Sequence, residues 1–221
     1  MSVRMIHLRK LLKLMYLAPN RRVSALRADI RDDIARESGD PGSGGDFYGP
    51  FWSDAKAHVF GSAYLPEMVQ VRIAANSGRA NLYPQLRDGF LLWWNERRRW
   101  TNEPFRQTDA IKTVHPIEEF DAYVKVANIM CVRDARDEDH YVYPYWFPDP
   151  ALADESGRVG LWLLRNALGT VDPRELRLLD VIRGQTFSLD RTPLAGNEEE
   201  RFQTRYRTLL AEWDALRTEY D

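Results

Sequence analysis

The stretch that most constrains the fold runs from residue 123 to residue 147, because β-favouring residues are dense enough there to build a sheet. Its letters YVKVANIMCVR are followed by a polar turn from Asp134 to Asp139 and then by HYVYPYWF. Two runs rich in Val, Ile and aromatic residues, on either side of a short polar segment, predict a β-hairpin. The first run is apolar on both alternating faces, which predicts a strand buried on both sides. Pro144 predicts that the second strand is an edge strand or a broken one.

The rest of the chain is dominated by apolar residues that recur every three or four positions, as on one face of a helix. Helices are predicted over residues 3–17, 21–37, 47–61, 65–76, 83–100, 157–168 and 197–220. Further strands are predicted over residues 110–117, 176–182 and 186–189. Because helix 157–168 is apolar nearly all round, we expect it to be buried against the sheet. The last helix begins with Asn197 and Glu200 at the spacing of a capping box, and its apolar stripe is expected to pack within the chain.

These elements predict an α+β fold, in which a helical N-terminal region is followed by a small mixed β-sheet with a buried helix and a long C-terminal helix. Residues 39–46 read GDPGSGGD, which is the composition of a flexible linker. The predicted regions are N-terminal helices over 1–38, the Gly-rich linker over 39–46, a helical region rich in basic and aromatic residues over 47–105, and a sheet-containing region over 106–221 that helix 197–220 closes. The last two regions are compatible with one compact domain.

The number of cysteines and the hydropathy of the chain predict its cellular compartment. Cys131 is the only cysteine, so no disulfide can form within one chain. Its place in an apolar strand pattern predicts a buried, unreactive thiol. The longest apolar run near the N-terminus, Leu14 to Ala18, is five residues long, which is too short for a signal sequence or a membrane span. The sequence therefore predicts a cytoplasmic protein with no membrane partner.

Charge is distributed unevenly along a chain whose formal net charge is −2. Residues 1–100 carry 16 Lys and Arg against 10 Asp and Glu, whereas residues 101–221 carry 15 against 23. The asymmetry is compatible with self-association, but a basic half also favours an anionic partner. The guanidinium group of arginine can bind phosphate through two N–H donors, and tryptophan rings can stack on bases. DNA or RNA is the predicted partner. The predicted nucleic-acid-binding residues are Lys56, Arg79, Arg97, Arg98, Arg99 and Trp100.

An acid and a histidine stand four residues apart at Asp54 and His58, on one face of a predicted helix. The two residue types suit proton transfer or one half of a metal site. One acid and one histidine are too few ligands to hold a metal, so a solvated ion pair is predicted instead. The sequence offers no complete catalytic set, and neither a cofactor nor a metal is expected.

The predicted elements between residues 84 and 183 follow the order α-β-β-β-α-β. In this order of elements the chain resembles the core of the PD-(D/E)xK nucleases. The resemblance implies carboxylates at strand ends that hold Mg²⁺ and a lysine on the third strand that serves the attacking water. The residues that come nearest to this pattern are Glu96, Asp121 and Lys125. The third predicted strand, HYVYPYWF, contains neither an acid nor a lysine.

The charge asymmetry and the Arg and Trp residues over 93–100 favour a non-enzymatic accessory protein that associates with nucleic acid or belongs to a larger complex. A divergent Mg²⁺-dependent nuclease is the first alternative. The second alternative is a protein-interaction module, in which helix 197–220 docks into a protein partner or a second copy of the chain. An apolar stripe buried within the monomer would remove the reason for this last alternative.

Overall fold

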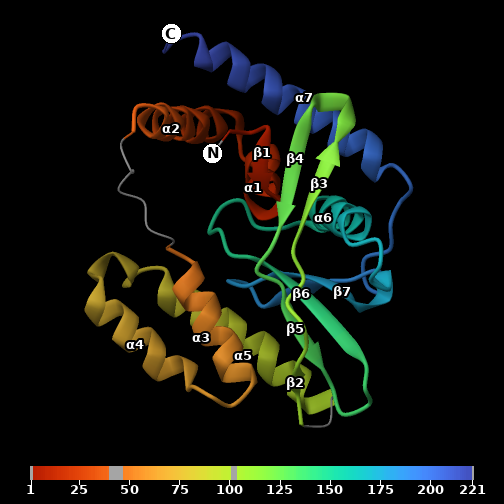
Figure 1. The fold of residues 1–221 in the computed structure, drawn as a ribbon. Helices are drawn as coiled ribbons and strands as arrows, with labels where there is room; N and C mark the ends of the chain where they lie inside the picture. Colours follow the sequence, from red (N-terminus) through yellow and green to blue (C-terminus); the bar gives the residue numbers. More distant parts are fainter. Residues whose placement is uncertain (1, 40–46, 101–103, 221) are drawn as a thin grey trace.

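The computed structural model describes residues 2–39, 47–100 and 104–220, apart from the side chains of residues 97–100. It confirms the α+β fold (Figure 1). The helices are α1 (Leu8–Tyr16), α2 (Pro19–Glu37), α3 (Gly49–Val59), α4 (Leu65–Ala75), α5 (Tyr83–Trp100), α6 (Asp154–Ala167) and α7 (Glu198–Arg217). Short 3₁₀ turns are η1 (Ser77–Arg79), η2 (Glu118–Phe120) and η3 (Pro173–Glu175). The strands are β1 (Met5–His7), β2 (Arg106–Gln107), β3 (Thr113–Ile117), β4 (Ala122–Val126), β5 (Met130–Arg133), β6 (Asp139–Tyr145), β7 (Leu176–Asp180) and β8 (Gln185–Phe187).

The strands form two mixed sheets. The smaller sheet has the order β1-β4-β3, with β1 parallel to β4 and β3 antiparallel to it. The larger sheet has the order β2-β5-β6-β7-β8, and its neighbours are antiparallel except for β6 and β7. Helix α6 makes the crossover that this parallel pair requires.

The predicted strand over 122–133 is wrong as a continuous element, because it breaks into β4 and β5 in different sheets. Asn128 lies at the break with a φ of +65°, a left-handed conformation that asparagine adopts more readily than most residues. Trp52 of α3 donates its indole N–H to the Asn128 carbonyl at 2.6 Å. Burial on both sides holds for β5, whereas Tyr123 of β4 is 41% exposed. The predicted hairpin is confirmed for β5 and β6, which pair antiparallel.

The position of β6 corrects a second prediction. The strand lies between β5 and β7, so it is not an edge strand of the sheet. Its pairing with β5 ends at Met130 opposite Val142. Pro144 therefore lies beyond the end of β5 and has only β7 beside it, opposite Leu179. Proline has no backbone N–H to donate to a neighbouring strand. It is tolerated at this position because β6 has a neighbouring strand on one side only.

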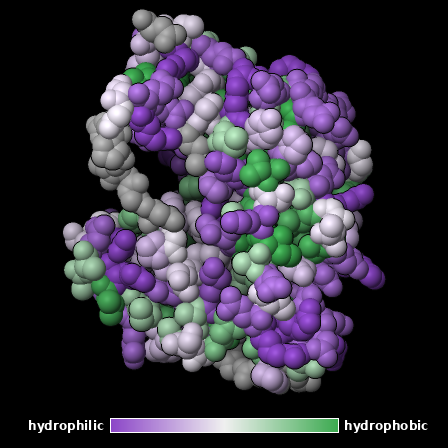
Figure 2. All heavy atoms as spheres, in the orientation of Figure 1, coloured by the Kyte–Doolittle hydropathy of each residue, from purple (hydrophilic) through white to green (hydrophobic). Residues whose placement is uncertain are grey.

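The larger sheet separates two hydrophobic cores. Helices α1, α2, α6 and α7 pack into one core together with the smaller sheet and one face of the larger sheet. Helices α3, α4 and α5 cover the other face, at the lower left of Figure 1 and of the space-filling view in the same orientation (Figure 2). Alternate residues of β5 serve the two cores, since Cys131 lies in the first and Met130 and Val132 lie in the second. The burial predicted for Cys131 and for the 157–168 helix is confirmed, and burial raises the pKa of the Cys131 thiol.

The first predicted helix begins later than expected. Residues 5–7 form β1, which pairs in parallel with β4 from Met5 opposite Tyr123, and the helix starts only at Leu8. Tertiary pairing overrides the helical periodicity of these first residues. The boundaries of the four predicted regions stay predictions, and residues 40–46 of the linker lie outside the described residues. Within the described ranges, no helix is both long and apolar enough to cross a membrane.

Helix α7 packs within the chain, as its apolar stripe predicted. The buried side chains of the stripe are Phe202, Tyr206, Leu209, Leu210, Trp213 and Leu216. The predicted capping box is wrong, because the Asn197 side chain makes no cap hydrogen bond. Instead the buried carboxylate of Glu198 accepts hydrogen bonds from the backbone N–H groups of Ala195 at 2.7 Å and Gly196 at 3.0 Å. Apart from Tyr220, which lies beyond the end of α7 and is 36% exposed, the stripe is buried within the chain, and this burial removes the main reason for treating it as a docking surface.

Candidate metal centre

The turn between β5 and β6 is organised by one buried carboxylate. Asp134 directly follows β5, and its side chain is 5% exposed. Its Oδ1 accepts hydrogen bonds from the backbone N–H groups of Arg136 at 2.8 Å and Glu138 at 3.1 Å. The backbone N–H of Asp134 donates to the Glu138 carbonyl at 3.0 Å, which closes the turn. The second carboxylate oxygen, Oδ2, is left to face the first residues of β6.

Three side chains meet at this turn. His140, the second residue of β6, places Nε2 3.2 Å from Oδ2 of Asp134. Glu138 is exposed beside them, and the potential ligand atoms of Asp134, Glu138 and His140 all lie within 4.8 Å of one another. Two carboxylates and one imidazole suit a borderline divalent ion such as Mn²⁺ or Zn²⁺. Three protein ligands would leave coordination positions open for water or a substrate oxygen.

Neighbouring groups favour the anionic forms of the carboxylates. Burial raises the pKa of Asp134, but hydrogen bonds from His140 and from two backbone N–H groups outweigh it and hold the pKa below its usual value. Arg133 clamps Asp139 with bonds of 2.7 and 2.8 Å, and this pairing holds the pKa of Asp139 below its usual value. Both carboxylates are therefore ionised at neutral pH, which is the state in which a carboxylate binds a metal.

The cluster lies at the wall of a hollow of about 360 Å³. Its other wall comes from η3 and the start of β7. The lining residues are Glu138, Asp139, His140, Asp172, Arg174, Glu175 and Arg177. Burial raises the pKa of Glu175, and the nearby carboxylates of Asp139 and Asp172 raise it further. The guanidinium of Arg177 donates to the carbonyl of Leu176 at 2.9 Å and also to the carbonyl of Arg174.

A second hollow, of about 210 Å³, adjoins the first through Arg177, which lines both. Its lining residues are Trp93, Glu96, Arg177, Gly184, Gln185, Thr186, Ser188, Asp190 and Arg191. Trp93 and Glu96 come from α5. Trp93 lies about one turn before the three consecutive arginines at positions 97–99, and Glu96 directly precedes them. The two hollows together run from the turn between β5 and β6 to the C-terminal end of α5.

The structure does not bring all the predicted nucleic-acid-binding residues together. Arg79 lies in η1, where its guanidinium is 5.3 Å from the centre of the Tyr83 ring at the first turn of α5. Residues 97–100 form the last turn of the same helix, roughly 25 Å away along its axis, and their side chains lie outside the described residues. Lys56 is half-buried in α3.

The three residues of the nuclease alternative are also dispersed. Glu96 lines the hollow that contains Arg177, whereas Asp121 lines a different hollow with Arg4 and Asp214. Lys125 is half-buried in β4. The larger sheet and its helices keep the order α-β-β-β-α-β, as α5, β2, β5, β6, α6 and β7. The first strand of this series is β2 and not β3, because β2 pairs with β5. The two hollows that Glu96 and Asp121 line share no lining residue.

Asp54 corrects the prediction of a solvated ion pair. Its side chain is 8% exposed, and it accepts two hydrogen bonds from Arg72 of α4, at 2.9 and 3.0 Å. Nδ1 of His58 instead lies 3.3 Å from the Ala63 carbonyl and 3.4 Å from the backbone N–H of Leu65. The bidentate pair ties α3 to α4, so the role of Asp54 is structural.

Sequence reasoning missed the cluster of Asp134, Glu138 and His140. From the sequence, residues 134–139 were interpreted only as a polar turn between two strands. The available signal was the hairpin itself, since antiparallel pairing brings the residues on either side of a short turn next to each other. Comparison with known proteins adds no candidate, because neither a scan against protein-family models nor a search of curated proteins finds a match for this chain.

Proposed function

We propose that the protein is a nucleic-acid-associated accessory protein that binds phosphate groups through a divalent cation held by Asp134, Glu138 and His140. One observation carries the proposal. The three potential ligands lie within 4.8 Å of one another, and two of them, Glu138 and His140, line a hollow together with Arg174 and Arg177. A divalent cation and arginine forks are the two means by which proteins commonly bind phosphate oxygens.

The cation and the arginines have complementary roles. Without a cation, the carboxylates around the hollow repel a phosphate. A divalent ion bound to the cluster neutralises the charge of the two ligand carboxylates and offers open positions to phosphate oxygens. Arg177 and the exposed Arg191 add positive charges along the second hollow, toward the end of α5. A single- or double-stranded backbone would follow this path through its phosphates, without base-specific contacts.

Metal-dependent phosphodiester hydrolysis is the second candidate function. A cation with open positions can activate a bound water, and the carboxylate of Glu175 lines the same hollow, where it can orient that water. This candidate uses a ligand set different from Glu96, Asp121 and Lys125. It requires the same cation, so one set of experiments addresses both functions.

Glu138→Gln is expected to raise the dissociation constant for Mn²⁺ at least tenfold, because the change removes one anionic ligand. The exposed Glu138 side chain makes the substitution compatible with folding. Mn²⁺ binding is measured by loss of the electron paramagnetic resonance signal of the free ion. The matched control is Glu67→Gln, an equal change of charge at an exposed position of α4, which is expected to leave Mn²⁺ binding unchanged. A wild-type protein that takes up no Mn²⁺ at millimolar concentration would contradict the proposed centre.

Nucleic-acid binding is then measured with single- and double-stranded DNA and RNA, at low and moderate salt, with and without Mn²⁺ or Mg²⁺. The proposal expects affinity to rise with the cation in the wild type and to respond little to it in Glu138→Gln. Arg191→Gln should lower the slope of log Kd against log salt by about one, as for the loss of one phosphate contact. Cation-dependent fragments on a denaturing gel would establish the second candidate, and equal affinity with and without the cation would refute the role of the centre.

A further inference from the structure

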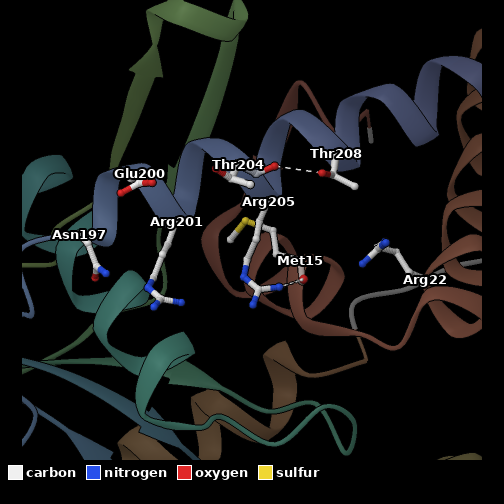
Figure 3. A pocket seen from close by; sticks show the side chains of 8 residues that line it. All are labelled: Met15, Arg22, Asn197, Glu200, Arg201, Thr204, Arg205 and Thr208. Atoms are coloured by element: carbon white, nitrogen blue, oxygen red, sulfur yellow. Dashed lines mark hydrogen bonds between the residues drawn. The ribbon is translucent and has the colours of Figure 1, made fainter.

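A separate hollow of about 500 Å³ lies between α7 on one side and α1 and α2 on the other (Figure 3). It shares no lining residue with the two hollows around Arg177. The lining residues are Met15, Arg22, Asn197, Glu200, Arg201, Thr204, Arg205 and Thr208. A volume of this size is typical of sites for small molecules.

Three guanidinium groups converge on this hollow. Figure 3 shows Arg201 and Arg205 reaching into it from α7, and Arg22 entering from α2 on the opposite side. The two α7 arginines are four residues apart, so one helical face carries both. Glu200, the acidic residue of the lining, lies along α7 rather than between the arginine tips.

Carboxylates behind the arginines fix their orientation. Glu212 accepts two bonds of 2.6 Å from Arg22, through Nε and Nη2. Glu155 of α6 accepts bonds of 3.0 and 2.7 Å from Nε and Nη2 of Arg205. Arg205 also stacks with its guanidinium carbon 4.2 Å from the centre of the Tyr16 ring. Side chains that are already ordered lose little conformational entropy when a ligand binds.

Donors remain available on the ligand side. Each guanidinium has five N–H donors, and among the described residues Arg201 uses only Nη1, in its bond to Glu155. Nη1 of Arg205 makes only a long contact of 3.4 Å to the Met15 carbonyl. The half-buried amide of Asn197 does not cap α7, and it lines the hollow. The hollow therefore offers N–H donors from Asn197, Arg201 and Arg205 to an acceptor-rich ligand.

We infer that this hollow binds a phosphate group, either as free phosphate or as the monoester of a small molecule. A tetrahedral dianion presents several acceptor oxygens, which match donors that arrive from different directions. The carboxylates of Glu155 and Glu212 clamp the arginines and Glu200 also lines the hollow, so the charges of the three guanidinium groups are balanced. The hollow therefore selects its ligand by the geometry of its hydrogen-bond donors. The volume beyond one phosphate leaves room for an organic group against Met15.

The inference is tested by isothermal titration of the full chain with inorganic phosphate and, separately, with adenosine 5′-monophosphate. Saturable binding is expected, and Arg201→Gln should raise the dissociation constant at least tenfold. Glu155 keeps its two bonds from Arg205 in this variant. The matched control is Arg207→Gln, which removes the same charge from α7 at an exposed residue that pairs with Glu119 outside the hollow. This control should bind phosphate as the wild type does.

The outcomes separate the two sources of phosphate. Equal affinities for inorganic phosphate and for the monoester identify a site for the free ion, whereas a monoester that binds at least tenfold more tightly identifies a site for a phosphorylated small molecule. Both results support the inference. It is overturned if neither probe binds saturably at millimolar concentration, or if Arg207→Gln weakens binding as much as Arg201→Gln does.

Discussion

Gly89→Ala is expected to lower the free energy of unfolding by about 3 kcal/mol, because α5 packs backbone to backbone on the turn between β7 and β8. A Cβ atom at position 89 would lie 2.2 Å from the carbonyl oxygens of Val181 and Ile182. These are backbone atoms, which cannot rotate away as a side chain would. The substitution therefore forces α5 away from the sheet. Urea-induced unfolding followed by circular dichroism measures the loss.

Gly169→Ala provides the matched control for that prediction. The nearest atom to a Cβ at position 169 is the Asn166 carbonyl oxygen, at 4.0 Å, so the stability should change by no more than about 0.5 kcal/mol. The close contact also has a functional aspect. Since α5 carries Trp93 and Glu96 into the hollow shared with Arg177, displacement of the helix should weaken nucleic-acid binding as well. A Gly89→Ala protein as stable as the wild type would show that α5 is not seated in this way.

Phe202→Ala is expected to lower the free energy of unfolding by about 4 kcal/mol, as for other fully buried phenylalanines. The side chain is 1% exposed, and its ring centre lies 5.3 Å from that of Tyr206 and 5.5 Å from that of Trp162. Its truncation leaves a cavity where α7 meets α6. Thermal and urea unfolding of the purified variant measure the effect.

The control for this prediction is Gln203→Ala, at the adjacent, half-buried position of α7, with an expected change within about 0.5 kcal/mol. The comparison also tests the alternative in which this helix docks into a protein partner or a second copy of the chain. If the stripe of α7 were a docking surface, Phe202→Ala would leave the monomer stable and abolish self-association in sedimentation experiments. The packing within the chain implies the opposite result.

Much of the fold follows from periodicity in the sequence. The helices at 157–168 and 197–220 carry apolar stripes long enough to be unambiguous, and both lie where the pattern places them. The hairpin of β5 and β6 follows from two β-rich runs beside a polar turn. These elements were predictable because each buries a face that its own local sequence defines.

Features that depend on distant partners were not predictable in the same way. Residues 5–7 have helical periodicity, but they form a strand because β4 offers them an edge. The break at Asn128 depends on a hydrogen bond from Trp52, which is remote in sequence. The cluster of Asp134, Glu138 and His140 is local, and the predicted hairpin implied that these residues are neighbours, but the conformation of the turn that brings their side chains together was not visible in the pattern. Local patterns in the amino-acid sequence do not encode such contacts, because the contacts form only when the elements assemble.

The pairing of β1 with β4 has a consequence for how the chain reaches its native state. Strand β1 is synthesised before its partner, which lies more than a hundred residues later, and α7, which completes the same core, comes later still. Contacts of such high sequence separation slow folding, and the growing chain must hold apolar surface exposed in the meantime. We therefore expect the core around α1 to form only after translation has passed α7, in a late step that joins segments far apart in the sequence.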